Sequence, residues 1–286
     1  MAAPVALRTR TRTPGAPNGL YLLLPAAILL SVFFLVPLSL MLQTSLSEGG
    51  QTYTQIFGSP LYAQVLWNTA RTALVTTLCC LALAYPYAYV LNRAGPRMKL
   101  VMLAVVLLPF WTSLLVRSFA WVGLLQDAGL LNTLLQALGV VTDPLELIRT
   151  PTGVLIGMVH VLLPYMVLPL VTTMGQIDPS VLRAAQSFGA GPWQRFQRVF
   201  LPLTLPGIVS GSVLVFVLSL GFYITPALLG GTSDVMIGET IVQEVTRFGP
   251  VTASALGLIL LAGTLVSVAL LLAARSLGTA RKGGTK

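Results

Sequence analysis

The sequence predicts an all-α polytopic membrane protein with six transmembrane helices. Of its 286 residues, 55% are hydrophobic and 9% are charged, and the mean hydropathy is +0.86. So few charged side chains cannot cover the surface of a soluble globular domain. Six apolar stretches also reach the length of about 20 residues that a helix needs to cross a hydrocarbon core about 30 Å thick. They lie near residues 20–43, 65–91, 100–122, 152–175, 205–229 and 251–274.

The charged residues indicate how these spans are oriented, because Lys and Arg concentrate in short cytoplasmic loops. Most of the 17 basic residues precede span one or follow spans two, four and six: Arg8, Arg10, Arg12, Arg93, Arg97, Lys99, Arg183, Arg195, Arg198, Arg275, Arg281, Lys282 and Lys286. The acidic residues other than Asp178 fall in the opposite loops. We therefore expect a cytoplasmic tail at 1–19, a membrane domain at 20–275 and a second cytoplasmic tail at 276–286.

The same distribution explains the net charge of +9 without a nucleic-acid partner, since it orients the chain in a lipid membrane. Basic residues ahead of an apolar run are also typical of a secretory signal peptide. The apolar run here is longer than a signal-peptide core and no small-residue cleavage site follows it cleanly. We expect an uncleaved first span.

The loop at 177–206 has the pattern of two short helices. Asp178 is suited to cap a helix that begins at Pro179. Gly189 can adopt the left-handed conformation that ends such a helix, and Pro192 is suited to begin a second one. Small or apolar residues follow one another at helical spacing between these signals: Ala184, Ala185 and Phe188. They form a surface that a partner can approach closely, although a partnerless hairpin at the membrane interface would use the same residues.

This loop resembles the cytoplasmic coupling loop of ABC-type import permeases. The resemblance rests on Ala184-Ala185, three residues, Gly189, nine residues, Val199, one residue and Leu201-Pro202. It implies the ABC type I importer permease fold and a loop that inserts into a groove on a separate ATPase subunit. Two positions depart from the family pattern. Val199 replaces the usual Ile, and Arg183 replaces a leading Glu, which reverses a charge and removes any ion pair that this Glu makes with the ATPase.

Further segments resemble spermidine/putrescine-type permeases, and the likeness covers roughly residues 60 to 275. They are residues 109–121, 129–135, 223–231 and 253–257. In the first of them, Trp111 and Trp121 flank Arg117, whose charge is costly in a membrane unless it faces a cavity, finds a partner or snorkels. The two indole rings either stack on a cationic or apolar solute or anchor the helix at the interface.

A second candidate surface lies on the outer side, around spans five and six. Glu239 and Glu244, with Asp234, either attract amines and a binding protein or belong to a solvated loop. Tyr223 completes this set of translocation-path candidates. Many polyamine permeases carry an acidic residue just before this aromatic segment, where the present chain has Gly221-Phe222, so a cation path lacks one carboxylate here.

Other polar residues in the spans are expected to be structural. His160 is interpreted as a hydrogen-bonded packing residue. Cys79 and Cys80 are adjacent on one helix, which makes a disulfide between them geometrically poor, so buried thiols are expected. No Cys/His spacing indicates a metal site. The glycine pairs Gly153/Gly157 and Gly207/Gly211 permit close approach of neighbouring helices.

These observations favour a transport subunit over an enzyme. The chain has no Gly-x-x-x-x-Gly-Lys-Ser/Thr loop, so no cofactor is expected in it, and ATP and Mg²⁺ must bind to a partner ATPase. The resemblance implies a bacterial inner membrane, a second homologous permease subunit (a heterodimer, with a homodimer as the alternative), two cytoplasmic ATPases and a periplasmic solute-binding protein. It also implies polyamines as the solute. Ferric iron, thiamine, aminoalkyl phosphonates and opines are alternatives.

Two other function classes are disfavoured by the same residues. An ion-coupled secondary transporter normally carries acidic groups near the membrane midplane, and none of the eight acidic residues lies in the middle of a predicted span. A polytopic membrane enzyme needs a nucleophile and base, or a metal cluster, within the membrane. Acidic residues and histidine are scarce in the spans.

Overall fold

The computed structural model describes the backbone of residues 20–283 and the side chains of residues 23–270 and Ala273. The predicted tail at 1–19 lies outside the described residues, as do the side chains of the basic residues at both ends of the chain. Within the described range the chain forms helices and turns, with no strand. The elements are α1 (Leu20–Ser45), α2 (Gln51–Gly58), α3 (Pro60–Arg93), α4 (Pro96–Leu107), η1 (Leu108–Trp111), α5 (Leu114–Leu125), α6 (Leu130–Ala137), α7 (Pro151–Gly175), α8 (Pro179–Ser187), α9 (Pro192–Arg195), η2 (Phe196–Phe200), α10 (Leu201–Leu220), α11 (Ile224–Leu229), α12 (Ile237–Arg247) and α13 (Pro250–Gly283).

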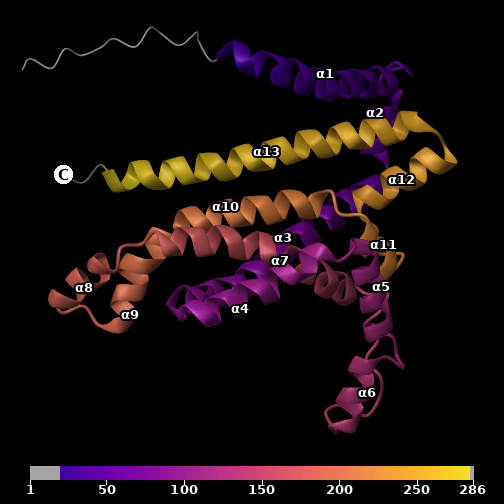
Figure 1. Ribbon diagram of the computed structural model, residues 1–286. Helices are drawn as coiled ribbons and strands as arrows, with labels where there is room; N and C mark the ends of the chain where they lie inside the picture. The colour runs from indigo at the N-terminus through magenta and orange to yellow at the C-terminus, as the bar shows by residue number, and fades with distance from the viewer. Residues whose placement is uncertain (1–19, 284–286) are drawn as a thin grey trace, which may run out of the picture.

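The core of the fold is the contact between α3, α7 and α10, which run beside one another (Figure 1). Its buried side chains are small or flexible and include Cys80, Met158, Met166 and Val215. Helix α13 adjoins α12 and α10, and α1 packs on α13. Helices α8 and α9 lie at the end of the molecule where α1 begins and α13 finishes, while α11 and α12 lie at the opposite end (Figure 1).

Six helical stretches of the described chain are long and apolar enough to cross a membrane, as the sequence predicted. They are Leu23–Ser45, Pro60–Arg93, Leu114–Ala137, Pro151–Gly175, Pro192–Leu220 and Pro250–Leu270. The predicted first, second, fourth and sixth spans fall on α1, α3, α7 and α13. Helix α13 continues to Gly283 and so extends into the predicted tail at 276–286.

The third predicted span, 100–122, was wrong as a single helix. Pro109 lacks a backbone N–H and its ring crowds the carbonyl of the preceding turn, which weakens the α-helix here, although α7 continues through Pro164 and Pro169. Helix α4 gives way to the short 3₁₀ turn η1, and Thr112 and Ser113 are extended, with ψ of 142° and 139°. Helix α5 then leaves the direction of α4 (Figure 1). The candidate span at this point of the chain is Leu114–Ala137, itself divided between α5 and α6.

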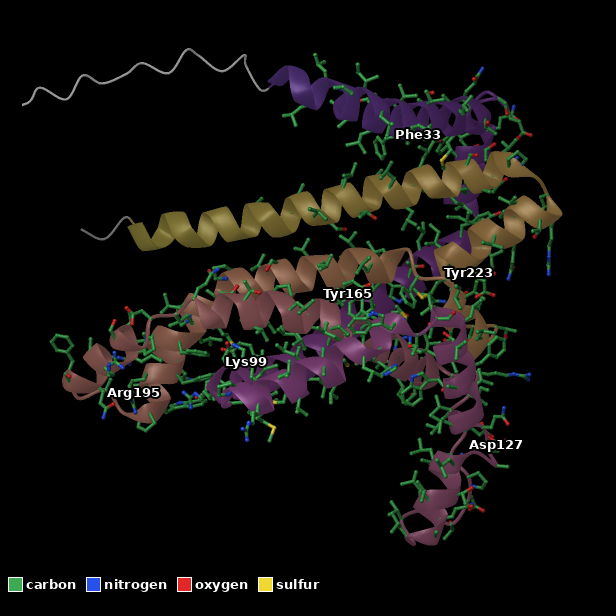
Figure 2. The ribbon with its side chains drawn as sticks, viewed as in Figure 1. Phe33, Lys99, Asp127, Tyr165, Arg195 and Tyr223 are labelled. Atoms are coloured by element: carbon green, nitrogen blue, oxygen red, sulfur yellow. The ribbon has the colours of Figure 1, made fainter. Side chains whose placement is uncertain are left out.

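The fifth predicted span, 205–229, was also too long at its outer end. Helix α10 begins at Leu201 and ends at Leu220, and the short helix α11 starts only at Ile224. Pro226 favours the break, because its ring would crowd the carbonyl of Phe222 in a continuous helix. Residues 221–223 form a bend that places Tyr223 at the end of the bundle where α11 and α12 lie, as labelled in Figure 2.

The glycine pairs do allow close approach of helices. A Cβ on Gly207 of α10 would lie 2.7 Å from Thr173 Oγ1 of α7, and a Cβ on Gly211 would lie 2.8 Å from Met166 Sδ. Gly157 of α7 faces α11 in the same way, 2.6 Å from a side-chain atom of Leu229. These distances are shorter than a real Cβ contact, so a larger residue at these positions would force neighbouring atoms to shift, and glycine permits the close packing of α7. Both cysteines are free thiols; Cys80 is buried, as expected, whereas Cys79 is half-buried.

Candidate functional site

The loop between α7 and α10 begins with a capped helix. Asp178 has an extended backbone and its Oδ1 accepts a hydrogen bond of 2.7 Å from the Ser180 N–H, and Pro179 occupies the first helical position. This backbone hydrogen bond is the main reason that the pKa of the exposed Asp178 carboxyl is lowered, and the charge of Arg183 acts in the same direction. The local prediction for the start of α8 is confirmed.

The end of α8 has the hydrogen bonds of a Schellman motif. Gly189 is left-handed, with φ of 79°. Its N–H donates to Gln186 O at 2.9 Å, and the N–H of Ala190 donates to Ala185 O at 3.1 Å. These bonds satisfy two carbonyls that a helix end otherwise leaves free. The chain then reverses into α9, which starts at Pro192 as predicted.

Aromatic side chains attach this hairpin to the membrane helices. We call Tyr85, Tyr89, Trp193, Phe196 and Phe200 the aromatic cluster. Phe196 meets Tyr85 and Tyr89 edge-on with ring centroids 6.2 and 6.1 Å apart, and Phe200 meets Tyr89 at 5.2 Å. Trp193 stacks on Phe196 at 5.7 Å. Such arrangements of rings are favourable beyond the area that they bury, so the hairpin is fixed to α3 through several side chains at once.

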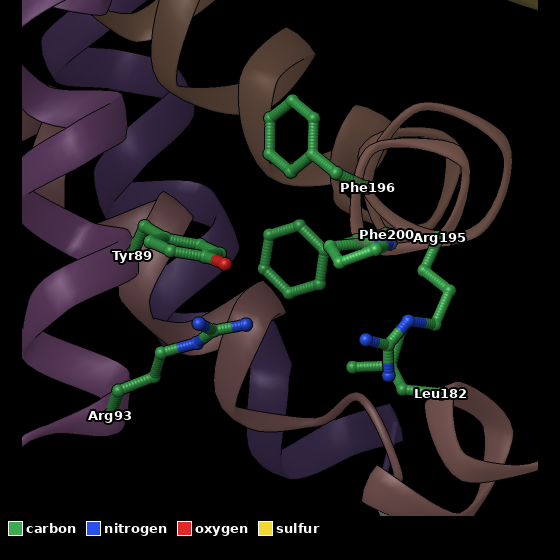
Figure 3. Close-up of a pocket in the computed structure, with 7 residues that line it drawn as sticks. Tyr89, Arg93, Leu182, Arg195, Phe196 and Phe200 are labelled. Carbon is green, nitrogen blue, oxygen red and sulfur yellow. The ribbon is translucent and has the colours of Figure 1, made fainter. Parts of the chain in front are cut away.

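A pocket opens between the hairpin and the end of α3 (Figure 3). Its volume is about 160 Å³, and its lining residues are Tyr89, Arg93, Leu182, Pro192, Arg195, Phe196 and Phe200. The guanidinium of Arg93 lies over the ring of Tyr89, with Cζ 4.0 Å from the centroid. Arg195 Nη1 donates to Gln186 Oε1 at 2.8 Å, which links α9 back to α8.

The outward surface of the hairpin exposes two large aromatic side chains among polar ones. Phe188 is 91% exposed and Trp193 is 66% exposed, and Ala184, Arg183 and Gly189 are also exposed. Ala185 is half-buried. Large exposed side chains on a polar loop indicate a contact surface. Leu201 and Pro202 instead begin α10 and are half-buried, so they connect the hairpin to a membrane helix.

The outer candidates form two separate groups. Arg117 and Trp121 lie one turn apart on α5, and Trp121 Nε1 donates to His160 Nδ1 of α7 at 3.1 Å. His160 is therefore a hydrogen-bonded packing residue, as predicted. Arg117 is half-buried, and its Nε is buried without a hydrogen-bond partner among the residues that the structure describes. Trp111 is 82% exposed.

The acidic candidates lie on α12. Glu239 is half-buried and accepts a hydrogen bond of 3.0 Å from Gln243 Nε2. Burial raises the pKa of the Glu239 carboxyl, and the Gln243 hydrogen bond partly opposes this. Glu244 Oε1 accepts a hydrogen bond of 3.0 Å from Tyr62 Oη, so it holds α12 against α3. Tyr223 lies close to the turn before Glu239, because a Cβ on Gly238 would be 3.4 Å from the Cβ of Tyr223.

Sequence reasoning missed the aromatic cluster. Its signal is present in two runs with helical spacing: Tyr85 and Tyr89 in the second span, and Phe196 and Phe200 after the hairpin. Residues four apart share one helix face. Each run therefore presents two rings to the same side, but the pairing of the two faces depends on a contact between segments more than 100 residues apart, roughly a third of the chain.

The fold and the hairpin define a class: a polytopic helical membrane protein with a helical hairpin that exposes a contact surface at one end of the bundle. Within this class the chain belongs to the family of binding-protein-dependent transport system inner membrane components, whose sequence pattern matches residues 19–277.

Named relatives agree with this assignment. The chain is 38% identical over 221 residues to the spermidine/putrescine transport system permease protein PotB of Haemophilus influenzae, which covers 76% of this chain and 77% of that protein. It is 38% identical over 189 residues to PotB of Escherichia coli, which covers 66% and 68%. A chain in the crystal structure of a bacterial alginate ABC transporter, in complex with an alginate pentasaccharide-bound periplasmic protein, has the same fold. Its TM-score is 0.72 at 20% identity, with 88% of this chain and 92% of that chain covered.

Proposed function

We propose that this chain is the permease subunit of an ATP-driven importer of polyamines, in which the hairpin at 177–206 receives the movement of a separate ATPase. The observation that carries this proposal is the attachment of the hairpin. An exposed apolar surface at its tip is continuous, through the aromatic cluster, with α3 and α10 in the core. A displacement of the tip is therefore transmitted to the helices that form the core, because packed side chains resist compression.

The surface at the tip fits a groove on a partner protein. Phe188 and Trp193 supply apolar area, and Ala184 and Gly189 keep the backbone accessible. Arg183 adds a positive charge in the middle of α8, where it is exposed, so the partner would present a neutral or acidic side chain there. We assign ATP and Mg²⁺ to that partner, and no cofactor to this chain.

The orientation follows from the charge distribution. The hairpin lies at the end where the described chain begins and finishes (Figure 1), and the basic residues of the short loops concentrate at that end. The positive-inside rule then places this end, and both termini, in the cytoplasm. Helices α11 and α12 face the periplasm, where a solute-binding protein would dock. A second homologous permease subunit and two ATPase subunits complete the assembly.

The solute is inferred to be a polyamine because the two PotB relatives are spermidine/putrescine transport system permease proteins. The acidic and aromatic residues of the outer end are compatible with an amine. Glu239 is half-buried and within reach of solvent, and Tyr223 lies next to the turn that precedes it. An aromatic ring beside a carboxylate attracts an ammonium group both by the ring quadrupole and by charge.

A competition uptake assay in a strain that lacks this chain tests the proposal. Restoring the chain with its partners should restore uptake of labelled spermidine, and unlabelled putrescine or spermidine should compete, whereas thiamine and 2-aminoethylphosphonate should not. Uptake should stop when ATP is depleted and persist when the proton gradient alone is collapsed. Competition only by a non-amine solute would overturn the polyamine assignment, and uptake that follows the gradient instead of ATP would overturn the ABC mechanism.

A further inference from the structure

The pocket beneath the hairpin concentrates positive charge that the chain does not neutralise. Arg93 and Arg195 both line it, and none of its other lining residues is acidic. Among the residues that the structure describes, neither guanidinium forms an ion pair with a carboxylate. The Nε of Arg195 is buried and has no hydrogen-bond partner in this part of the chain, although Nη1 binds Gln186.

An unpaired buried donor costs free energy, and two guanidinium groups that share one cavity repel each other. An anion in the pocket would relieve both costs. The guanidinium fork matches the geometry of phosphate oxygens, so a phosphate group fits this lining better than a halide or a neutral polar molecule.

The position of the pocket identifies the source of the phosphate. Arg93 is the last residue of the candidate span Pro60–Arg93, and Pro192 is the first residue of the candidate span Pro192–Leu220. The pocket therefore lies at the ends of two stretches that can cross a membrane, on the side of the bundle that carries the hairpin. Aromatic side chains are enriched where such stretches meet the polar headgroups. Tyr89 lines the pocket, and Trp193 stacks on Phe196 of the lining.

Helix α4, which follows α3, exposes apolar surface suited to acyl chains. Helix α4 begins at Pro96, shortly after Arg93, and is joined to α3 by a hydrogen bond of 2.7 Å from Tyr87 Oη to Met102 O. Its side chains Leu100 and Val101 are 71% and 56% exposed. A lipid with its phosphate in the pocket would find an apolar helix face beside it.

We propose that this pocket binds the phosphate of an anionic phospholipid in the leaflet that surrounds the hairpin end of the bundle. Basic pockets between membrane helices bind lipid headgroups in this way. The bound phosphate bridges Arg93 of α3 and Arg195 of the hairpin, and so adds an electrostatic link to the aromatic cluster. The consequence is that anionic lipid stiffens the hairpin against the core, whatever solute the protein carries.

The test uses the full-length chain, purified in a neutral detergent. Its thermal unfolding is followed while phosphatidylglycerol is titrated into the micelles, with phosphatidylcholine and inorganic phosphate as separate arms. We expect a saturable rise of the unfolding midpoint with phosphatidylglycerol and a much smaller rise with phosphatidylcholine or phosphate. In the Arg93→Gln/Arg195→Gln variant the apparent affinity for phosphatidylglycerol should fall at least about tenfold, since charge-assisted hydrogen bonds are lost.

Two variants separate lipid binding from general effects. Gln186→Ala removes the hydrogen bond within the hairpin but keeps Arg195, and Arg198→Gln removes an exposed charge outside the pocket lining. Both should keep the lipid response. The single variant Arg93→Gln, which leaves the hairpin unchanged, should weaken it even if the double variant fails to fold.

The proposal is overturned by an equal response to phosphatidylcholine, by an unchanged affinity in Arg93→Gln, or by a rise with inorganic phosphate as large as that with lipid. A lack of response to any phospholipid would also overturn it, and would leave the pocket to an acidic side chain of a protein partner.

Discussion

Replacing Gly189 tests whether the hairpin must keep its shape for transport. Gly189 has φ of 79°, and a Cβ at this position would have nothing within 4 Å. The substitution Gly189→Thr therefore causes no collision, and its whole cost comes from forcing a β-branched residue into the left-handed region. That cost is about 1–2 kcal/mol, which corresponds to a loss of about tenfold in the population of the native turn relative to open forms.

The expected result follows from the hydrogen bonds at this turn. In open forms the two bonds that end α8 are broken, and the apolar tip no longer has the surface that a partner would fit. We expect uptake to slow by up to about tenfold, the limit that the change in this ratio sets, and the recovery of a copurifying ATPase to weaken. The amount of protein in the membrane and the unfolding midpoint of the bundle should stay unchanged, because Gly189 is exposed and remote from the core.

The same substitution at Gly191 is the matched control. A Cβ on Gly191 would also have nothing within 4 Å, but the φ of Gly191 is −66° and the residue caps α9. Thr and Gly are about equally favourable at a helix N-cap. Gly191→Thr should transport normally, and Gly189→Asn should retain most activity because Asn tolerates the left-handed region. Normal uptake by Gly189→Thr, or an equal loss in Gly191→Thr, would refute the reasoning.

Three further predictions concern the core, the cap and the outer end. Gly207→Ala should lower the unfolding midpoint by an amount equivalent to about 1–3 kcal/mol. Gly263→Ala on α13 is the control and should not lower it, because a Cβ on Gly263 would have nothing within 4 Å. Equal midpoints in the two variants would contradict the close packing of α7 on α10. The Ser180 N–H donates to the ionised Asp178 carboxylate and thereby lowers its pKa, so the contribution of the cap is present above the ordinary Asp range and is lost as the pH falls through the lowered value. Hydrogen exchange of the α8 amides should accelerate on acidification, and Asp178→Asn should remove that pH dependence. Neutralising Glu239 and Glu244 together should slow amine uptake, and unchanged kinetics would make both carboxylates structural. The raised pKa of Glu239 means that the folded protein keeps this carboxyl protonated to a higher pH than the unfolded chain does, so stability should fall as the pH rises above the ordinary Glu range. Glu239→Gln should abolish that loss of stability.

Local sequence signals predicted the parts of the fold that depend on neighbouring residues. The ends of α8 follow from Asp178, Pro179 and Gly189, because caps and left-handed turns involve only residues within one helical turn. The two wrong spans had the same cause. Hydropathy reports how apolar a stretch is and not whether its helix is continuous, so the breaks near Pro109 and Pro226 were hidden inside apolar runs.

Contacts between distant segments were harder to predict. Trp121 was interpreted as either a solute platform or an interface anchor, and its hydrogen bond to His160 depends on how α5 crosses α7. The link from Tyr62 to Glu244 joins residues 182 positions apart. Neither partner carries a local signal for the other, because the geometry arises only when the helices pack.

The position of Arg195 shows why a charged residue can serve two purposes at once. Counted along the sequence, it is one more positive charge in a cytoplasmic loop, and orientation alone explains it. In the structure its guanidinium is half-buried, linked to Gln186 and shared with the pocket that Arg93 also lines. Orientation requires only that the charge stay in water, so burial of this side chain needs a further cause. Because a buried, unpaired Nε is costly, an anion from the surrounding membrane is the simplest compensation available at this depth, and it would connect the hairpin to the lipid as well as to a partner protein.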